Sequence, residues 1–371
     1  MNYRSYLQRK TRQPAFLWRL VIWIIALGFA FGALAQYWFQ PNPAADFAKK
    51  PSSNQWQHIE QLAQQGQWVK AWWSIPERML ADYGHTGPML LAIFAGCCWL
   101  AFLLHALQVK VLRDARLWYA LAAVALGVLS IWPTLFFILV QEEGWGLHES
   151  QELIPGLRFF IIGVGLREEL AKLICLLPLM PLLIKQRNEL TILLVSACVG
   201  LGFAVEENIG YFIGSHGQAA IGRFLTANPF HMTATGLIGL AVSRAIRYPR
   251  EWAPQALATF GVIVFAHGLY DAAISIPALN EYSIITTIVF ILIIYQFFRE
   301  LRQLRTTGRD TISLTATFLA GVALTAAATF VYLSATLGCG PAIQNLTGDI
   351  LTMSLMVYLF LREMPETMVR V

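Results

Sequence analysis

The sequence predicts an all-α protein, a polytopic bundle of about ten transmembrane helices with both termini in the cytoplasm. Composition is the first observation: of 371 residues, 57% are hydrophobic and 13% are charged, whereas an ordinary soluble domain carries about a quarter of its residues as charges. Second, apolar runs of about 20 residues, each long enough to cross a bilayer, recur along the chain. Third, the Lys and Arg residues lie mainly in short loops between these runs, which is the pattern that orients membrane proteins.

Ten apolar segments make up the predicted bundle. They cover residues 17–39, 88–108, 117–140, 157–184, 190–213, 229–246, 255–275, 282–298, 312–337 and 345–361. Placing the N-terminus inside puts most basic residues on the cytoplasmic side, as the positive-inside rule requires. Both termini then lie in the cytoplasm, which agrees with an even number of spans.

The chain is expected to form one membrane domain with three regions. Residues 1–155 hold three spans and the single long outer loop, 40–86, whose stretch around Trp56, Trp68, Trp72 and Trp73 predicts an amphipathic helix at the headgroup level. Residues 156–275 form a four-helix catalytic core, and residues 276–371 add three spans. Ala33-Leu34-Ala35 resembles a signal cleavage site, but we expect the first segment to remain as an anchor.

Charge and cysteine content exclude several function classes. The net charge is +5, yet the basic residues are dispersed between apolar runs, so nucleic acid is not an expected partner and the lipid bilayer is. Of the five cysteines, four lie inside apolar runs as small hydrophobic residues, and none forms a CxxC pair. Neither a disulfide framework nor a thiolate metal site is predicted.

The fourth segment contains the first group of buried charges. Charged side chains at bilayer depth are costly, so they usually face the bundle interior and mark a site. Glu168 and Lys172 are four residues apart on one helical face, and Glu169 is three residues before the lysine. Lys172 can neutralise one carboxylate while the other stays free for chemistry. The alternative is an ion pair that only fixes helix packing.

Three further segments each contribute polar residues. On the fifth, Glu207 shares a face with Phe203 and Tyr211, while Glu206 points about 100° away, which favours Glu207 as the site residue. The sixth carries His231, and the seventh carries His267 and Asp271, four residues apart on one face. Counted along the helices, all these residues can meet in the outer half of the membrane.

Glutamate and imidazole ligands suit zinc, and a catalytic zinc keeps three protein ligands with water in the remaining position. We therefore predict that Glu207, His231 and His267 hold a zinc ion and that Glu168 acts as general base. Asp271 would orient His267, and Glu169 and Lys172 would complete the charge balance. Which glutamate is ligand and which is base stays open, as does a mechanism that uses paired glutamates without a metal.

Four motifs in order along residues 156–275 resemble the PrsW family of intramembrane proteases. They are EExxK at 168–172, FxxxE at 203–207, HxxxxxxxG from His231 to Gly239, and HGxxD at 267–271. That family is similar to the wider group of CAAX-processing membrane proteases, which carry histidine where this chain has Glu207. The resemblance implies an endopeptidase of the bacterial cytoplasmic membrane that cleaves a membrane-anchored protein near its extracytoplasmic side. An anti-sigma factor cut at site 1 is the kind of substrate it implies.

Three other function classes remain as alternatives. An aspartyl protease would use Asp271 with Asp349, although the GxGD pattern lacks its first glycine at Leu346. A proton- or ion-coupled transporter also embeds Asp, Glu and His in its helices, but usually in paired halves. A non-catalytic scaffold or immunity protein would keep the pocket without cleaving anything.

Overall fold

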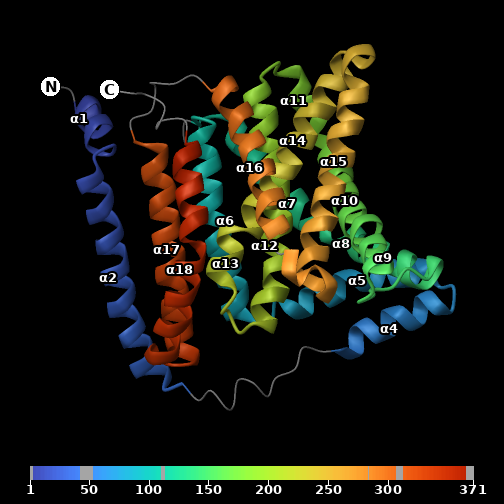
Figure 1. Cartoon of the computed structure of the whole chain (residues 1–371), viewed down its shortest axis with the longest axis horizontal. Helices are drawn as coiled ribbons and strands as arrows, with labels where there is room; N and C mark the ends of the chain where they lie inside the picture. Colours follow the sequence, from blue (N-terminus) through green and yellow to red (C-terminus); the bar gives the residue numbers. More distant parts are fainter. Residues whose placement is uncertain (1–2, 42–52, 110–112, 283, 306–311, 365–371) are drawn as a thin grey trace.

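The computed structural model describes residues 1–371 except 1–2, 42–52, 110–112, 283, 306–311 and 365–371. Every regular element in this described part is helical, and most helices run side by side as one bundle (Figure 1). The predicted all-α membrane bundle is confirmed. Residues 42–52 of the predicted outer loop lie outside the described residues.

The N-terminal third supplies a short and a long helix at the edge of the bundle, two helices that lie across its end, and one in its interior. These elements are α1 (Tyr3–Lys10), α2 (Pro14–Phe39), α4 (Ser53–Gln64), α5 (Trp68–Asp82) and α6 (Thr86–Ala106). Helix α2 packs along α17, where a Cβ on Gly28 would lie 2.6 Å from Ala327 Cβ. Small residues at such a crossing let two membrane helices approach closely.

The central third contains the most broken helices. Its elements are α7 (Ala115–Leu129), α8 (Ile131–Leu139), η1 (Val140–Gly144), α9 (Leu153–Arg158), η2 (Phe159–Gly165), α10 (Leu166–Leu176), η3 (Leu177–Leu179), α11 (Met180–Lys185), α12 (Glu189–Gly214), α13 (Ala220–Leu225), α14 (Ala227–Arg247) and α15 (Pro249–Ser275). Helix α12 lies at the centre and is buried along nearly all of its length. The C-terminal third adds η4 (Pro277–Tyr282), α16 (Ile284–Leu304), α17 (Leu314–Thr336) and α18 (Cys339–Glu363).

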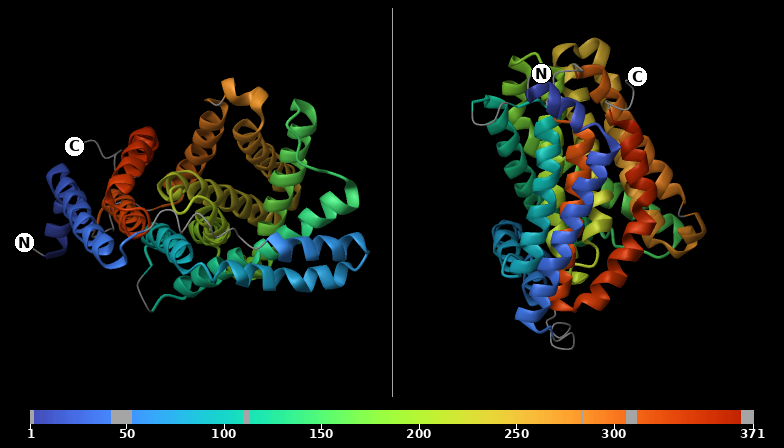
Figure 2. Two further views of the ribbon diagram at one scale, coloured as in Figure 1. Left: turned by 90° about the horizontal axis from the view of Figure 1, so that it is seen from below. Right: turned by 90° about the vertical axis from the view of Figure 1, so that its left-hand side faces the viewer.

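Six helices of the described part are long and apolar enough to cross a membrane. They are α2, α6, the α7–α8–η1 segment, α12, α15 and α17. The other four predicted spans correspond to the α9–α11 segment, α14, α16 and α18, which lie beside these six in the bundle (Figures 1 and 2). The α9–α11 segment is interrupted by the π-helix η2 and by η3. The count of about ten spans therefore stays a prediction.

Both terminal regions of the chain lie at one end of the bundle. Helix α1, the end of α18 and the start of α15 lie at one end, and α4, α5 and α13 lie at the other (Figure 1). Arg302 binds Glu363 at 2.5 Å at the first end, where Arg247 and Arg250 also lie. The described parts of the N- and C-terminal regions thus share one side.

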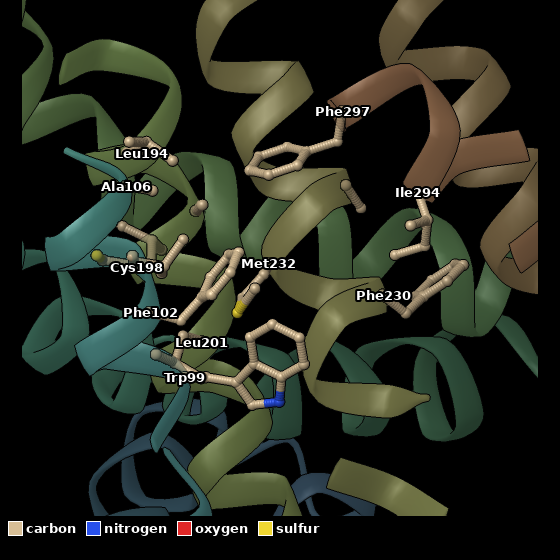
Figure 3. Close-up of a cluster of buried hydrophobic side chains, with 14 of the residues drawn as sticks. Trp99, Phe102, Ala106, Leu194, Cys198, Leu201, Phe230, Met232, Ile294 and Phe297 are labelled. Atoms are coloured by element: carbon tan, nitrogen blue, oxygen red, sulfur yellow. The ribbon is translucent and has the colours of Figure 1, made fainter. Parts of the chain in front are cut away.

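A large apolar core fixes the helices around α12. Trp99 of α6 is 1% exposed, and its indole Nε1 donates to the Phe224 carbonyl at 2.8 Å. Around it pack Phe102 and Met232, and Phe230 and Phe297 extend the same cluster toward α16 (Figure 3). An indole buried with its N–H satisfied gives both apolar contact and a fixed orientation.

The Trp-rich stretch forms two helices, α4 and α5, where the sequence predicted one amphipathic helix. Figures 1 and 2 show both lying across the end of the bundle. Trp72 of α5 stacks on Trp132 of α8 with ring centroids 4.9 Å apart, and Trp132 Nε1 donates to the Trp72 carbonyl at 2.9 Å. Trp73 also contacts the Trp132 ring at 5.3 Å but stays 65% exposed, whereas Ala71, Ile75 and Met79 of α5 are buried. This division into a packed and an exposed face is typical of helices at a membrane interface.

Candidate active site

The seven predicted site residues meet in one cluster built from four helices. Helix α10 contributes Glu168, Glu169 and Lys172, α12 contributes Glu207, α14 contributes His231, and α15 contributes His267 and Asp271. Five of these side chains are buried, whereas the side chains of Glu207 and Asp271 are 22% and 28% exposed.

The two glutamates of α10 have different surroundings. Lys172 Nζ donates to Glu169 Oε1 at 2.6 Å, and both side chains are fully buried. Glu168 Oε2 is buried without a hydrogen-bond partner. One carboxylate is thus neutralised by the lysine, as the spacing of the three residues allowed, while its neighbour has an oxygen without a hydrogen bond, 3.5 Å from His267 Nε2.

His267 is oriented by Glu169. Its Nδ1 lies 2.7 Å from Glu169 Oε1, which leaves Nε2 facing Glu168 Oε2 at 3.5 Å and Asp271 Oδ2 at 3.4 Å. Carboxylates commonly fix metal-binding histidines in this way, through the ring nitrogen that does not bind the metal. The sequence had assigned this orienting role to Asp271. Asp271 instead lies beside Nε2, and its distance of 3.4 Å is longer than the 2.7 Å between Glu169 and Nδ1.

His231 lies between a lysine and a glutamate. Its Nδ1 is 3.0 Å from Lys172 Nζ, and its Nε2 is 3.2 Å from Glu207 Oε2. The His231 and His267 rings are 5.3 Å apart, and Phe203 packs on His231 at 4.9 Å. Phe230 lies 5.2 Å from the His267 ring, so aromatic side chains hold both imidazoles.

Close helix crossings bring these side chains together. A Cβ on Gly268, next to His267, would lie 2.4 Å from Ile161 Cα of η2, and one on Gly200 would lie 2.1 Å from the His231 carbonyl oxygen. Only glycine permits backbones to approach this closely. The π-helix η2 ends immediately before α10, and such irregular turns occur often at functional sites.

Several polar residues of the site were not predicted from the sequence. Arg223 of α13 donates to Glu207 and Asn208, and its guanidinium carbon lies 3.6 Å from the centre of the Tyr211 ring. Asn208 donates to Asn228 Oδ1 at 2.6 Å, and both side chains are fully buried. The available signal was Arg223 itself, a basic residue on the outer side, where basic residues are few.

A cavity of about 600 Å³ opens beside the cluster. Glu168, Glu206, Glu207 and Asp271 line it, together with Arg167 and residues of α4, α5, α8 and η2. Arg167 was also not predicted: it is buried and donates to Gln141 Oε1 at 3.2 Å. The cavity lies at the end of the bundle that α4 and α5 cover, which gives a polar, water-accessible space at one membrane face.

Three of the clustered residues have the geometry of a metal site. Glu168, His231 and His267 each offer one ligand atom, and these atoms lie within 4.8 Å of one another. The sequence had favoured Glu207 as the third ligand. Glu207 instead contacts Arg223 and the His231 Nε2 atom, while Glu168 has the buried, unpartnered oxygen. The donor set of one carboxylate and two imidazoles suits zinc.

Comparison with known proteins gives a family match. Residues 115–297 match the sequence model of the PrsW family intramembrane metalloproteases. This part of the chain belongs to the PrsW family. The PrsW match includes all four motif-bearing helices and begins at α7, before the first motif. No curated protein and no solved structure matches the chain.

PrsW membership identifies the chain as a multi-pass membrane protease and does not favour the transporter and scaffold alternatives. The aspartyl alternative also lacks structural support. Asp349 lies on α18, which packs against α17 and α13, whereas Asp271 faces the cavity from α15. Figures 1 and 2 place α15 and α18 in different parts of the bundle.

Proposed function

We propose that the chain is a zinc-dependent intramembrane endopeptidase that cleaves membrane-anchored proteins near their extracytoplasmic side. The observation that carries this proposal is the convergence of Glu168, His231 and His267 from three helices, with ligand atoms within 4.8 Å. These three residues would hold the zinc ion. Bound zinc supplies a Lewis acid that polarises the scissile carbonyl and makes water nucleophilic near neutral pH.

The assignment exchanges the two glutamates relative to the sequence-based hypothesis. Glu168 is the ligand, and Glu207 accepts the proton of the attacking water. A base must be ionised, and a carboxylate in a low-dielectric site stays ionised only with a cationic partner; Arg223 is that partner. Arg223 and His231 both contact Oε2 of Glu207, so Oε1 remains for the proton.

The remaining residues orient the reacting groups. Glu169 holds the His267 ring through Nδ1, and Lys172 balances the charge of Glu169. Asp271 lies 3.4 Å from His267 Nε2, the nitrogen left for the metal, so it adds negative charge beside the metal position and Glu169 alone orients the ring. Such supporting contacts matter because catalytic groups must be held within fractions of an ångström of their working geometry.

The substrate class follows from the position of the cavity. The cavity lies at the end of the bundle opposite the basic residues of α14 and α15. The positive-inside rule assigns those basic residues to the cytoplasm, so the end with the cavity is extracytoplasmic. Family membership supports a membrane-anchored protein substrate, with site-1 cleavage of an anti-sigma factor as the leading case. The family resemblance likewise supports the bacterial cytoplasmic membrane as the location.

Elemental analysis of the purified protein tests the metal. We expect about one zinc per chain, lost in Glu168→Ala, His231→Ala and His267→Ala. His105→Ala is the control, because His105 lies on α6 and contacts Thr317 Oγ1 at 2.7 Å outside the site. Retention of zinc in Glu168→Ala together with loss in Glu207→Ala would restore the original assignment, and absence of metal from a folded, proteolytic protein would indicate a glutamate mechanism.

Cleavage in proteoliposomes tests the reaction. A panel of single-span proteins, analysed by mass spectrometry, should yield products cut near the outer end of the span. Glu207→Gln should retain zinc and lose activity by about a hundredfold or more, the usual scale for a general base. If Glu207→Gln cleaves at the normal rate, the proton is accepted elsewhere.

A further inference from the structure

Glu206 is a buried carboxylate that the catalytic proposal does not use. It points away from Glu207 on α12, its residue is only 9% exposed, and it lines the cavity. Among the described residues it forms neither a hydrogen bond nor an ion pair. A buried charge without a partner is costly, and a carboxylate that lines an open cavity can gain such a partner from outside the chain.

The surroundings of Glu206 carry excess negative charge. Asp82, Glu207 and Arg78 are the charged groups that act on Glu206, and Arg78 is already paired with Asp82 at 2.5 Å. Burial and then the charges of Glu206 and Asp82 raise the pKa of Tyr83, at the end of α5, to about 12. Around the whole cavity, carboxylates outnumber the guanidinium groups of Arg78 and Arg167.

We propose that Glu206, together with Asp82, forms a subsite that binds a cationic side chain, arginine or lysine, of the substrate next to the cleaved bond. This inference rests on the proposed function and adds a substrate preference to it. A divalent cation fits less well, because the metal-type cluster found among the described residues is Glu168, His231 and His267, without Glu206.

The cavity that Glu206 lines also has apolar and aromatic walls. Trp56, Met79 and Ile209 line the same cavity as Glu206, and they offer apolar and aromatic contacts for an aliphatic stem. Arginine and lysine bury such stems while their charged heads reach polar groups, and a guanidinium also stacks well on an indole.

Geometry places this subsite close to the reaction. Glu206 and Glu207 are adjacent, with Cα atoms about 3.8 Å apart, and an extended peptide advances about 3.3 Å per residue. The cationic residue should therefore lie within about three residues of the cleaved bond. Basic residues are scarce on the outer flank of membrane spans, so this requirement would select few substrates.

Direct binding tests the subsite without requiring cleavage. The probes are two short capped apolar peptides that differ only in having arginine or its neutral isostere citrulline at the central position. With full-length protein in detergent, we expect the arginine peptide to bind about tenfold more tightly than the citrulline peptide, and Glu206→Gln to remove that preference. Equal binding of the two peptides to the wild type, including no measurable binding, would overturn the subsite.

Two further variants guard against misfolding and general charge effects. Glu77→Gln is the matched control, because Glu77 is an exposed acid on α5 outside the cavity and its loss should leave the preference intact. Asp82→Asn should weaken the preference, so the inference remains testable if Glu206→Gln does not fold. An unchanged preference in both Glu206→Gln and Asp82→Asn would also overturn it.

The same preparations separate this inference from the proposed function. Cleavage of single-span substrates that is indifferent to replacing their flanking arginine with glutamine contradicts the subsite and leaves the protease proposal standing. A preference for the arginine peptide in a protein that cleaves no substrate contradicts the protease proposal and leaves the subsite standing.

Discussion

At the scale of single residues, the site is organised by the way charges are paired. Lys172 neutralises Glu169, Arg223 neutralises Glu207, and Glu168 keeps an oxygen without a partner. In a low-dielectric interior each pairing decides which carboxylate can bind a metal, accept a proton or only support its neighbour. The chemical roles of three glutamates therefore follow from which cation lies beside each one.

Lys172→Met tests the most deeply buried pair. Both Lys172 and Glu169 are 0% exposed, so the variant leaves a buried anion without its ammonium partner, which typically costs about 3–5 kcal/mol. We expect a clear fall in the melting temperature in detergent. The double variant Lys172→Met with Glu169→Gln should recover most of the lost stability but not activity, because the Glu169 carboxylate also orients His267. Lys70→Met, at an exposed position on α5, should melt like the wild type, and a normal melting temperature for Lys172→Met would contradict the pairing.

At the scale of helices, backbone contacts set the positions of the catalytic side chains. Helix α15 touches η2 at Gly268, and α12 touches α14 at Gly200. Both contacts lie beside a site histidine, so a change in either crossing would move an imidazole. Gly268 belongs to the HGxxD motif, which thus combines a site histidine with the glycine that lets its helix approach.

Gly268→Ala should displace the site without changing any polar group. The added Cβ would meet Ile161 Cα at 2.4 Å, and such overpacking typically costs about 1–3 kcal/mol because backbones must separate. We expect a lower melting temperature and reduced zinc content. Gly261→Ala on the same helix is the control: no atom lies within 4 Å of its Cβ position, and helix propensity favours alanine by about 1 kcal/mol. Equal behaviour of the two variants would show that this crossing does not position His267.

The sequence predicted which helices carry the site residues, but it did not predict how those helices pack against one another. The site residues were identifiable because a charge within an apolar run is costly and therefore conspicuous. The partners of those charges were not, because pairing depends on how α10, α12 and α14 are rotated against one another. Arg223 and Asn208 illustrate this: Arg223 comes from the short helix α13 between spans, and Asn208 only faces it because of where α13 packs.

At the scale of the whole molecule, the bundle separates a closed apolar core from an open polar end. The aromatic cluster around Trp99 fixes one side of α12, and the cavity with its carboxylates lies on the other, beneath α4 and α5. A packed core beside an open polar recess suits an intramembrane protease, since hydrolysis requires water at a depth where the bilayer excludes it.

The sequence predicted the class of this architecture better than its number of spans. Apolar runs alone identified the membrane bundle, but the segment 157–184 is broken at η2 and η3 and carries the buried charges of α10. Helix α14 likewise includes Asn228, His231 and two arginines. Functional residues lower the hydropathy of the helices that hold them, so the catalytic helices are the hardest to count as spans.

Cysteine labelling decides whether these polar helices cross the membrane. In a variant without the five native cysteines, single cysteines replace Glu152, Lys185, Arg250 and Glu281, all of them exposed. If the α9–α11 segment and α15 both cross, a membrane-impermeant maleimide added outside intact cells should label positions 152 and 281. Positions 185 and 250 should react only after the membrane is opened. Labelling of 152 and 185 from the same side would mean that the α9–α11 segment re-enters without crossing, and the outer position of the cavity would then have to be reassigned.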